Sequence, residues 1–315
     1  MRRGESKTII EKSLERIRER RWTKLSQQWM PHIPSINPAG SAPRDPLNTF
    51  YGFEQAAKHA IVSSPYREEV AGVRQLVLWE GIYLLHKAAH VVGAAEQHAK
   101  SGMQTWSLSG GYHGALFAAK AILHMLGVAL PEYRVPGKNQ NKSVLVDLWP
   151  EMPKLSSKQK QRGITNPPEI EFSYLGLRME NRHVWRILRR VINVSRIDIW
   201  PVEYVRALRK VGPAEFGWQR NVIHYDNCRW FFDDLHQLVL DMNFGVPDAD
   251  IAKSLEFSRN TTAFSLILGL VLFKLAKLLF DDIAGVSNKL VGERHLIHTG
   301  ASDSQRHPIY LSAYA

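Results

Sequence analysis

Residues 67 to 100 carry no proline and repeat apolar side chains at helical spacing, and this stretch constrains the fold more than any other. It predicts one long helix with a broad apolar face. A second segment, residues 107 to 126, reads SLSGGYHGALFAAKAILHML, and Gly127 after it is a favourable helix stop. The alanines and glycines of this segment predict a helix that another helix approaches closely.

The rest of the chain lacks an alternating strand pattern of any length. Further helices are predicted at residues 5–29, 48–62, 177–194, 202–211 and 251–287, and a helix in the stretch 217–235 is predicted to run on to about residue 242. Residues 129 to 172 contain six prolines and a basic run, and they are predicted to be a mostly irregular insertion. Within it, residues 144 to 148 are either a short strand or a helical turn. The sequence therefore predicts an all-α fold, a helical bundle with an N-terminal basic helix, an irregular insertion and a long C-terminal helix.

Three parts are expected along the chain. Residues 1–46 form a basic helix and a proline-rich linker, residues 47–243 form the helical domain, and residues 244–315 form an apolar helix and a flexible tail. The apolar run Thr261 to Phe273 is shorter than the roughly 20 residues of a membrane-spanning helix. We therefore expect no membrane association, and interpret Thr261 to Phe280 as either a dimer interface or a buried core helix.

The basic charge of the chain is clustered. The formal net charge is +11, which favours an acidic partner and nucleic acid first. Residues 177 to 210 hold nine Lys or Arg and three Asp or Glu. The candidate nucleic-acid-binding residues are Arg182, Arg186, Arg189 and Arg190. Trp185, Trp200 and Tyr204 lie among them, so stacking on RNA bases is one interpretation, and aromatic core residues beneath a solvated arginine face are the other.

Neither a metal nor a cofactor is predicted. The single cysteine, Cys228, excludes an internal disulfide and a cysteine-based zinc site, which fits a cytoplasmic protein. The N-terminal segment has no apolar core of a secretory signal. His86 and His90 are spaced like two metal ligands on a helix, but no third ligand lies near them in the sequence. The chain also lacks phosphate-binding and dinucleotide-binding glycine motifs.

The candidate catalytic residues are Arg220, Asn221 and His224, in the segment RNVIH. Side chains four residues apart on a helix face the same way, one turn apart. An arginine offers a charged fork that suits phosphate, and a histidine transfers protons near neutral pH. Asn221 between them is placed to hold either one. The combination is suited to cleaving a phosphodiester.

Residues 107 to 127 and the segment RNVIH together resemble a HEPN domain, the helical family of higher-eukaryote and prokaryote nucleotide-binding proteins. The first is similar to the family's Ala-rich second helix, and the second resembles its motif of Arg, a polar residue, a short spacer and His. The resemblance covers about residues 67 to 243. It implies a metal-independent endoribonuclease that works as a homodimer, with a cyclic phosphate product. His224 would be the general acid or base, Arg220 would stabilise charge on phosphorus, and Asn221 would orient the site.

The resemblance also implies partners. Many such proteins are toxins or antiviral effectors, so an antitoxin or a regulatory protein is expected beside RNA. The spacer between Arg220 and His224 is three residues, shorter than is usual in the family. This favours the alternative, a non-catalytic HEPN-like module that binds RNA, nucleotide or a protein. A third interpretation is a helical scaffold in which the two residues form a structural pair.

Overall fold

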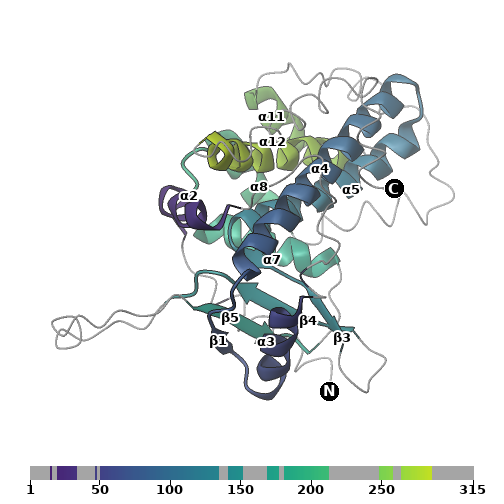
Figure 1. Cartoon of the computed structure of the whole chain (residues 1–315). Helices are drawn as coiled ribbons and strands as arrows, with labels where there is room; N and C mark the ends of the chain where they lie inside the picture. The colour runs from purple at the N-terminus through teal and green to yellow at the C-terminus, as the bar shows by residue number, and fades with distance from the viewer. Residues whose placement is uncertain are drawn as a thin grey trace.

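The protein is mostly helical, with a small antiparallel sheet at one end (Figure 1). The computed structural model describes residues 15, 20–33, 47, 50–134, 141–151, 169–176, 181–212, 248–257 and 264–285. The predominantly helical class of the fold prediction is confirmed. The prediction did not include the sheet, in which five strands pair.

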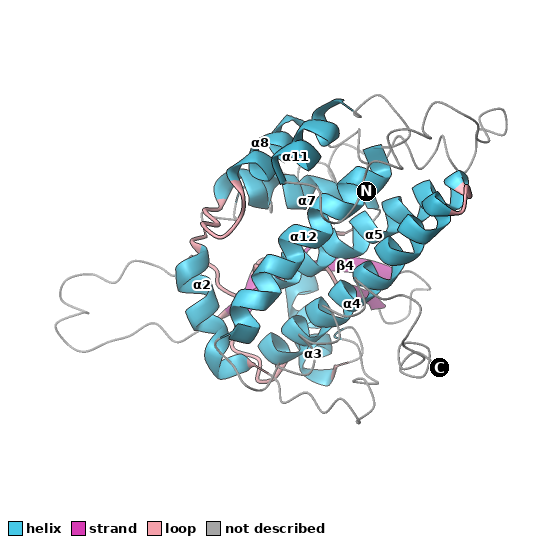
Figure 2. Ribbon diagram, turned by 90° about the horizontal axis from the view of Figure 1, so that it is seen from above, coloured by secondary structure: helices cyan, strands magenta, loops and turns pink. Residues whose placement is uncertain are grey.

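A helical hairpin forms the centre of the structure. Helix α4 (Val73–Lys100) is followed, after a three-residue turn, by α5 (Gln104–Met125), so the two run antiparallel. Gly102 in the turn has a φ of +73°, a conformation that glycine adopts without a steric cost. The prediction of an Ala-rich helix at 107–126 is confirmed. Helix α12 (Phe264–Gly285) packs on α5 and α4, as Figure 2 shows from above.

Three glycines of α5 permit this close packing. A Cβ at Gly110 would lie 2.9 Å from Ala95 Cβ, and one at Gly114 would lie 2.5 Å from Val92 Cγ2, both on α4. Gly111 faces α12 instead, where an added Cβ would lie 2.5 Å from Leu266 Cα. Successive residues of a helix are rotated by about 100°, so the glycines serve two different helix contacts on adjacent sides of α5.

The remaining helices pack on this hairpin, on α12 or on one another. Helices α7 (Asn181–Val194) and α8 (Val202–Lys210) are amphipathic, and α7 packs on α5. Helix α11 (Asp248–Phe257) packs on α8 and α12. Helix α2 (Trp22–Trp29), continued by the 3-10 turn η1 (Met30–His32), contacts α12.

The sheet has the order β1-β5-β4-β2, with β3 also paired to β4. Its strands are β1 (Tyr66–Glu68), β2 (Val128–Ala129), β3 (Glu132–Arg134), β4 (Asn141–Asp147) and β5 (Ile170–Tyr174). All pairs are antiparallel. Helix α3 (Tyr51–Val62) packs against β5 and β1.

Two sequence predictions are wrong because the chain forms this sheet. The segment 129–172 is not mostly irregular, because the described parts of it contribute β3, β4 and most of β5. Consecutive residues Ser143 to Asp147 of β4 are all buried, so the strand lacks the alternation that marks a half-exposed strand. The long helix begins at Val73 rather than residue 67, because residues 66–68 pair with β5 more than 100 residues away.

The C-terminal helix differs from its prediction too. Residues 248–257 and 264–285 are two helices, α11 and α12, instead of one helix from 251 to 287. Nearly every residue of α12 from Phe264 to Phe280 is buried within the single chain, which supports a core helix. None of the described helices has the length and apolar character needed to cross a membrane.

The Gly111 contact gives the first prediction. In Gly111→Ala the new Cβ meets backbone atoms of α12, so the two helices must move apart. We expect the free energy of unfolding to fall by about 1–3 kcal/mol, measured by urea denaturation followed by circular dichroism. Gly285→Ala is the control, since a Cβ there meets nothing within 4 Å. Equal stability of Gly111→Ala and Gly285→Ala would contradict this account of the helix crossing.

Candidate functional site

The predicted catalytic residues Arg220, Asn221 and His224 lie outside the described residues, as does Cys228. The described range that precedes them ends at Gly212, two residues after α8. The helices that lead toward this segment, α7 and α8, are therefore the nearest described elements before it in the sequence.

The four predicted RNA-binding arginines lie on the outer face of α7. Arg182 is exposed, and Arg186, Arg189 and Arg190 are half-buried. Successive residues of a helix are rotated by about 100°, so the four side chains start from one stripe about 100° wide. The opposite face is buried and consists of His183, Val184, Trp185, Ile187, Leu188, Val191 and Ile192. The helix thus separates its cationic surface from its apolar core contact.

The aromatic residues among these arginines belong to the core. Trp185 and Tyr204 have no exposed surface, and Trp200 is 6% exposed. The indole N–H of Trp200 donates to the carbonyl of Leu275 in α12, at 3.1 Å. The interpretation of these three rings as base-stacking groups is therefore wrong, and the alternative of a core beneath an arginine surface is confirmed. The sequence pattern could not distinguish the two interpretations, because core rings and surface arginines alternate at helical spacing.

Helix α8 extends the basic surface. Arg206, Arg209 and Lys210 are exposed. Arg209 Nη2 donates to the carbonyl of Ile192 at 3.3 Å and so joins α8 to α7. Lys210 forms a 2.9 Å ion pair with Glu256 of α11. The cationic surface therefore runs over two helices that are held together by one of its own arginines.

A buried polar cluster joins α4 to α5. His124 Nδ1 donates to the carbonyl of Lys120 at 2.7 Å, and its Nε2 lies 3.4 Å from Glu80 Oε2. Glu80 Oε1 accepts the backbone N–H of Leu47. Burial by itself would raise the pKa of Glu80, but His124 and the Leu47 amide outweigh it and hold that pKa below its usual value. The cluster fixes the position of Leu47, which is fully buried.

The two histidines spaced like metal ligands have different environments. His86 is 5% exposed, whereas His90 is exposed on the surface of α4. Within the described ranges, no group of three or more His, Cys, Asp or Glu side chains is arranged to hold a metal ion.

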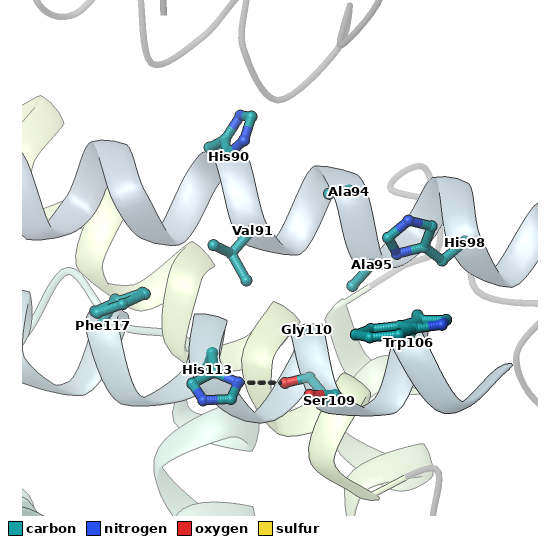
Figure 3. Close-up of a pocket in the computed structure, with 10 residues that line it drawn as sticks. All are labelled: His90, Val91, Ala94, Ala95, His98, Trp106, Ser109, Gly110, His113 and Phe117. Atoms are coloured by element: carbon teal, nitrogen blue, oxygen red, sulfur yellow. Dashed lines mark hydrogen bonds between the residues drawn. The ribbon is translucent and has the colours of Figure 1, made fainter. Parts of the chain in front are cut away.

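A pocket of about 330 Å³ lies between α4 and α5 near the turn of the hairpin (Figure 3). It is lined by His90, Val91, Ala94, Ala95, His98, Trp106, Ser109, Gly110, His113 and Phe117. The His113 Nδ1–H donates to the carbonyl of Ser109 at 2.9 Å, which fixes that ring. No sequence motif predicted this pocket, although the lining residues of each helix recur at three- and four-residue steps.

Glu80 gives a prediction about pH. Because the pKa of Glu80 is lowered in the folded chain, its ionised form stabilises the fold above the ordinary value of 4.5. That contribution is lost as the pH falls through the lower folded-state pKa. We expect Glu80→Gln to lower the free energy of unfolding at pH 7 by about 1–3 kcal/mol, with a difference from wild type that shrinks below about pH 4.5.

Urea denaturation at a series of pH values measures this difference. Glu54→Gln is the matched control, because Glu54 forms an exposed ion pair with Lys58 at 2.9 Å, and such pairs contribute little. A destabilisation of Glu80→Gln that persists unchanged at low pH would show that the carboxylate charge is not its cause.

Comparison of the chain with protein-family models, curated proteins and solved structures gave no significant match. A function is therefore inferred from the chemistry of three features. They are the arginine surface of α7 and α8, the pocket between α4 and α5, and the sequence motif at residues 220–224.

Proposed function

We propose that this protein is a metal-independent endoribonuclease of the HEPN type that works as a homodimer in the cytoplasm. The observation that carries the proposal is the arginine surface of α7, which presents four cationic side chains on one stripe. The mostly helical fold and the central α4–α5 hairpin are compatible with the resemblance of residues 107–127 and 220–224 to that family.

RNA is the substrate class that this surface favours. From Arg182 to Arg190 the helix rises about 12 Å, which spans more than one phosphate of a strand. Arginine forks bind phosphate oxygens in pairs and keep their charge at any physiological pH. Because the aromatic rings of α7 and α8 are buried, this surface contacts the RNA backbone rather than its bases.

The proposed reaction needs proton transfer and charge stabilisation. The ribose 2′-hydroxyl gives its proton to a base, its oxygen attacks the adjacent phosphorus, and the bond from phosphorus to the 5′ oxygen breaks. The 5′ oxygen takes up a proton, which leaves a 2′,3′-cyclic phosphate and a 5′-hydroxyl. His224 supplies one of these proton transfers, Arg220 stabilises the charge on phosphorus, and Asn221 orients the site.

The dimer and the biological role are parts of the same proposal. Two Arg220 and His224 motifs would meet in a shared cleft, so the active species contains two copies of the chain. Such an enzyme must be restrained in its own cell, and an antitoxin or regulatory protein would supply that restraint in a toxin or antiviral system.

The catalytic prediction concerns the motif itself. We expect His224→Ala and Arg220→Ala each to reduce cleavage of labelled RNA in EDTA by about a hundredfold or more, because each removes a group that acts in the transition state. Asn221→Ala should have a smaller effect. Initial rates and the end groups of the products provide the measurement. Lys253→Ala, an exposed residue of α11, serves as the control.

The outcomes separate the proposed nuclease from its alternatives. Absence of cleavage by the wild type, or equal cleavage by the wild type and both variants, would rule out the nuclease. RNA binding without cleavage would support the non-catalytic module that the short spacer favours. A solution mass equal to one chain in the active species would contradict the shared cleft.

The arginine surface gives a separate prediction about RNA affinity. Replacing Arg186 and Arg189 with glutamine should weaken binding of single-stranded RNA irrespective of its sequence. The slope of log K against log salt should fall by roughly 0.7 for each phosphate that the protein ceases to neutralise. Lys58→Gln and Lys253→Gln, on α3 and α11, are matched controls for removal of an exposed charge. An unchanged slope would place the RNA elsewhere on the protein.

A further inference from the structure

The outer face of the α4–α5 hairpin carries aromatic, imidazole and ammonium groups that take no part in the proposed cleavage reaction. On α4 these positions are Lys87, His90, Val91, Ala94 and His98, and on α5 they are Trp106, Ser109, Gly110, His113, Phe117 and Lys120. Both sets follow steps of three and four residues, so each set starts from one side of its helix. The two sets flank the pocket of Figure 3, and this pocket together with Lys87 and Lys120 beyond its Phe117 end is named the α4–α5 groove.

Small residues form the floor of the groove. A Cβ at Gly110 would lie 2.9 Å from Ala95 Cβ, so the two backbones approach closely and leave space above them. The larger side chains His98 and Trp106 stand at one end, and Phe117 stands at the other, as Figure 3 shows. The resulting volume of about 330 Å³ is at the small end of the range for ligand sites and suits one flat ring system.

Trp106 is the most unusual residue of the groove. Its side chain is 61% exposed, although indoles are normally buried in large part. Trp185 and Trp200, by contrast, are buried. An exposed indole at the rim of an apolar pocket offers a flat face on which a planar ligand can stack.

The opposite end of the groove is cationic. The Nζ of Lys87 lies 6.0 Å from the centre of the Phe117 ring, and Lys87 is exposed. Lys120, one turn beyond Phe117, is half-buried. Burial lowers the pKa of Lys120, Glu132 opposes this effect, and the Lys87 ammonium adds to it. Lys87 is thus the exposed cation at this end.

The two carboxylates near Lys120 are engaged elsewhere. Glu80 accepts the backbone N–H of Leu47, and Glu132 accepts a hydrogen bond from Asn141 at 3.1 Å. Their charges moderate the field of Lys120, whereas Lys87 lies over the ring of Phe117 and is exposed to solvent. A phosphate that approaches this end of the groove therefore meets Lys87 first.

We propose that the α4–α5 groove binds an unpaired segment of RNA, with one base stacked on Trp106 and the backbone directed toward Lys87. From Lys87 to His98 the helix rises about 16 Å, so the groove accommodates a short extended strand rather than an enclosed small molecule. Stacking on an aromatic ring is tolerant of base identity, and a cation along the strand contacts its phosphates. The inference rests on the proposed function in that RNA is the ligand.

The groove supplies what the arginine surface lacks. The rings of α7 and α8 are buried, so those two helices offer no stacking platform for a base. Trp106 provides one on a different helix. Residues 220–224 then cut the strand, while the α4–α5 groove holds an unpaired base of the same molecule.

The test measures binding of the full chain to a labelled single-stranded RNA whose 2′-hydroxyls are methylated, because this RNA cannot undergo the proposed cleavage. Fluorescence anisotropy gives the Kd. We expect Trp106→Ala to raise the Kd about fivefold to a hundredfold, and Trp106→Phe to retain most of the affinity. Tyr51→Ala is the matched control, since Tyr51 is an aromatic residue of α3 that is 71% exposed. Equal affinities of Trp106→Ala and Tyr51→Ala would overturn the proposal.

Lys87→Gln tests the other end of the groove. It should raise the Kd and reduce the salt dependence of binding by roughly 0.7 in slope, whereas Lys253→Gln should do neither. Thermal melting followed by circular dichroism checks that each variant is folded, which the exposure of Trp106 and Lys87 leads us to expect.

Failure of this inference and failure of the proposed nuclease give different results. A wild-type chain that does not bind the methylated RNA overturns the groove proposal. Normal RNA binding by Trp106→Ala, together with loss of cleavage in His224→Ala, contradicts RNA binding in the groove and supports the proposed nuclease. Weak binding by Trp106→Ala, together with normal cleavage by His224→Ala, supports the groove and rules out the proposed catalytic site.

Discussion

The close contact of α5 with two helices at once is the constraint on which the rest of the structure depends. Gly110 and Gly114 allow α4 to approach on one side, and Gly111 allows α12 to approach on the adjacent side, where a Cβ at Gly269 would lie 2.6 Å from the Gly111 carbonyl oxygen. Larger side chains at these positions would separate the three helices. A third side of α5 contacts α7, where Asn181 Nδ2 donates to the Tyr112 hydroxyl at 3.1 Å. The groove lies along the side of α5 that these packed helices leave uncovered.

The arginines of the chain have two different physical roles. Several hold the sheet to the helices, for example Arg20, which pairs with Asp147 of β4 at 2.5 Å and donates to the carbonyl of Leu126. Arg67 of β1 joins two strands of the sheet, because it pairs with Glu171 of β5 at 2.7 Å. Charges of this kind are engaged within the fold and do not reach a polyanion. The count of 41 lysines and arginines therefore overstates the cationic surface, and in the described part of the chain α7 and α8 carry one part of that surface.

The two proposed RNA contacts lie on different helices, and this separation has a consequence for specificity. Backbone contacts from the arginines of α7 would bind any strand, whereas a stacking site requires an unpaired base. A double-stranded RNA would satisfy the first contact and not the second. In the proposed arrangement the protein would distinguish single-stranded from paired RNA without reading the base sequence, because the discriminating group is a ring rather than a set of hydrogen-bond donors.

The sequence by itself determined the helical class, the Ala- and Gly-rich helix α5, the outward stripe of arginines on α7 and the motif at residues 220–224, since these follow from local spacing along one chain. It did not determine the sheet, because β1 and β5 are distant in sequence and β4 is buried on consecutive positions without alternation. Only the tertiary structure decided that Trp185, Trp200 and Tyr204 are core residues, while Trp106 is exposed. An aromatic residue has the same appearance in a sequence whether it packs inward or stands at a rim. Its environment depends on which neighbouring helices cover it, and that is a property of the assembled bundle.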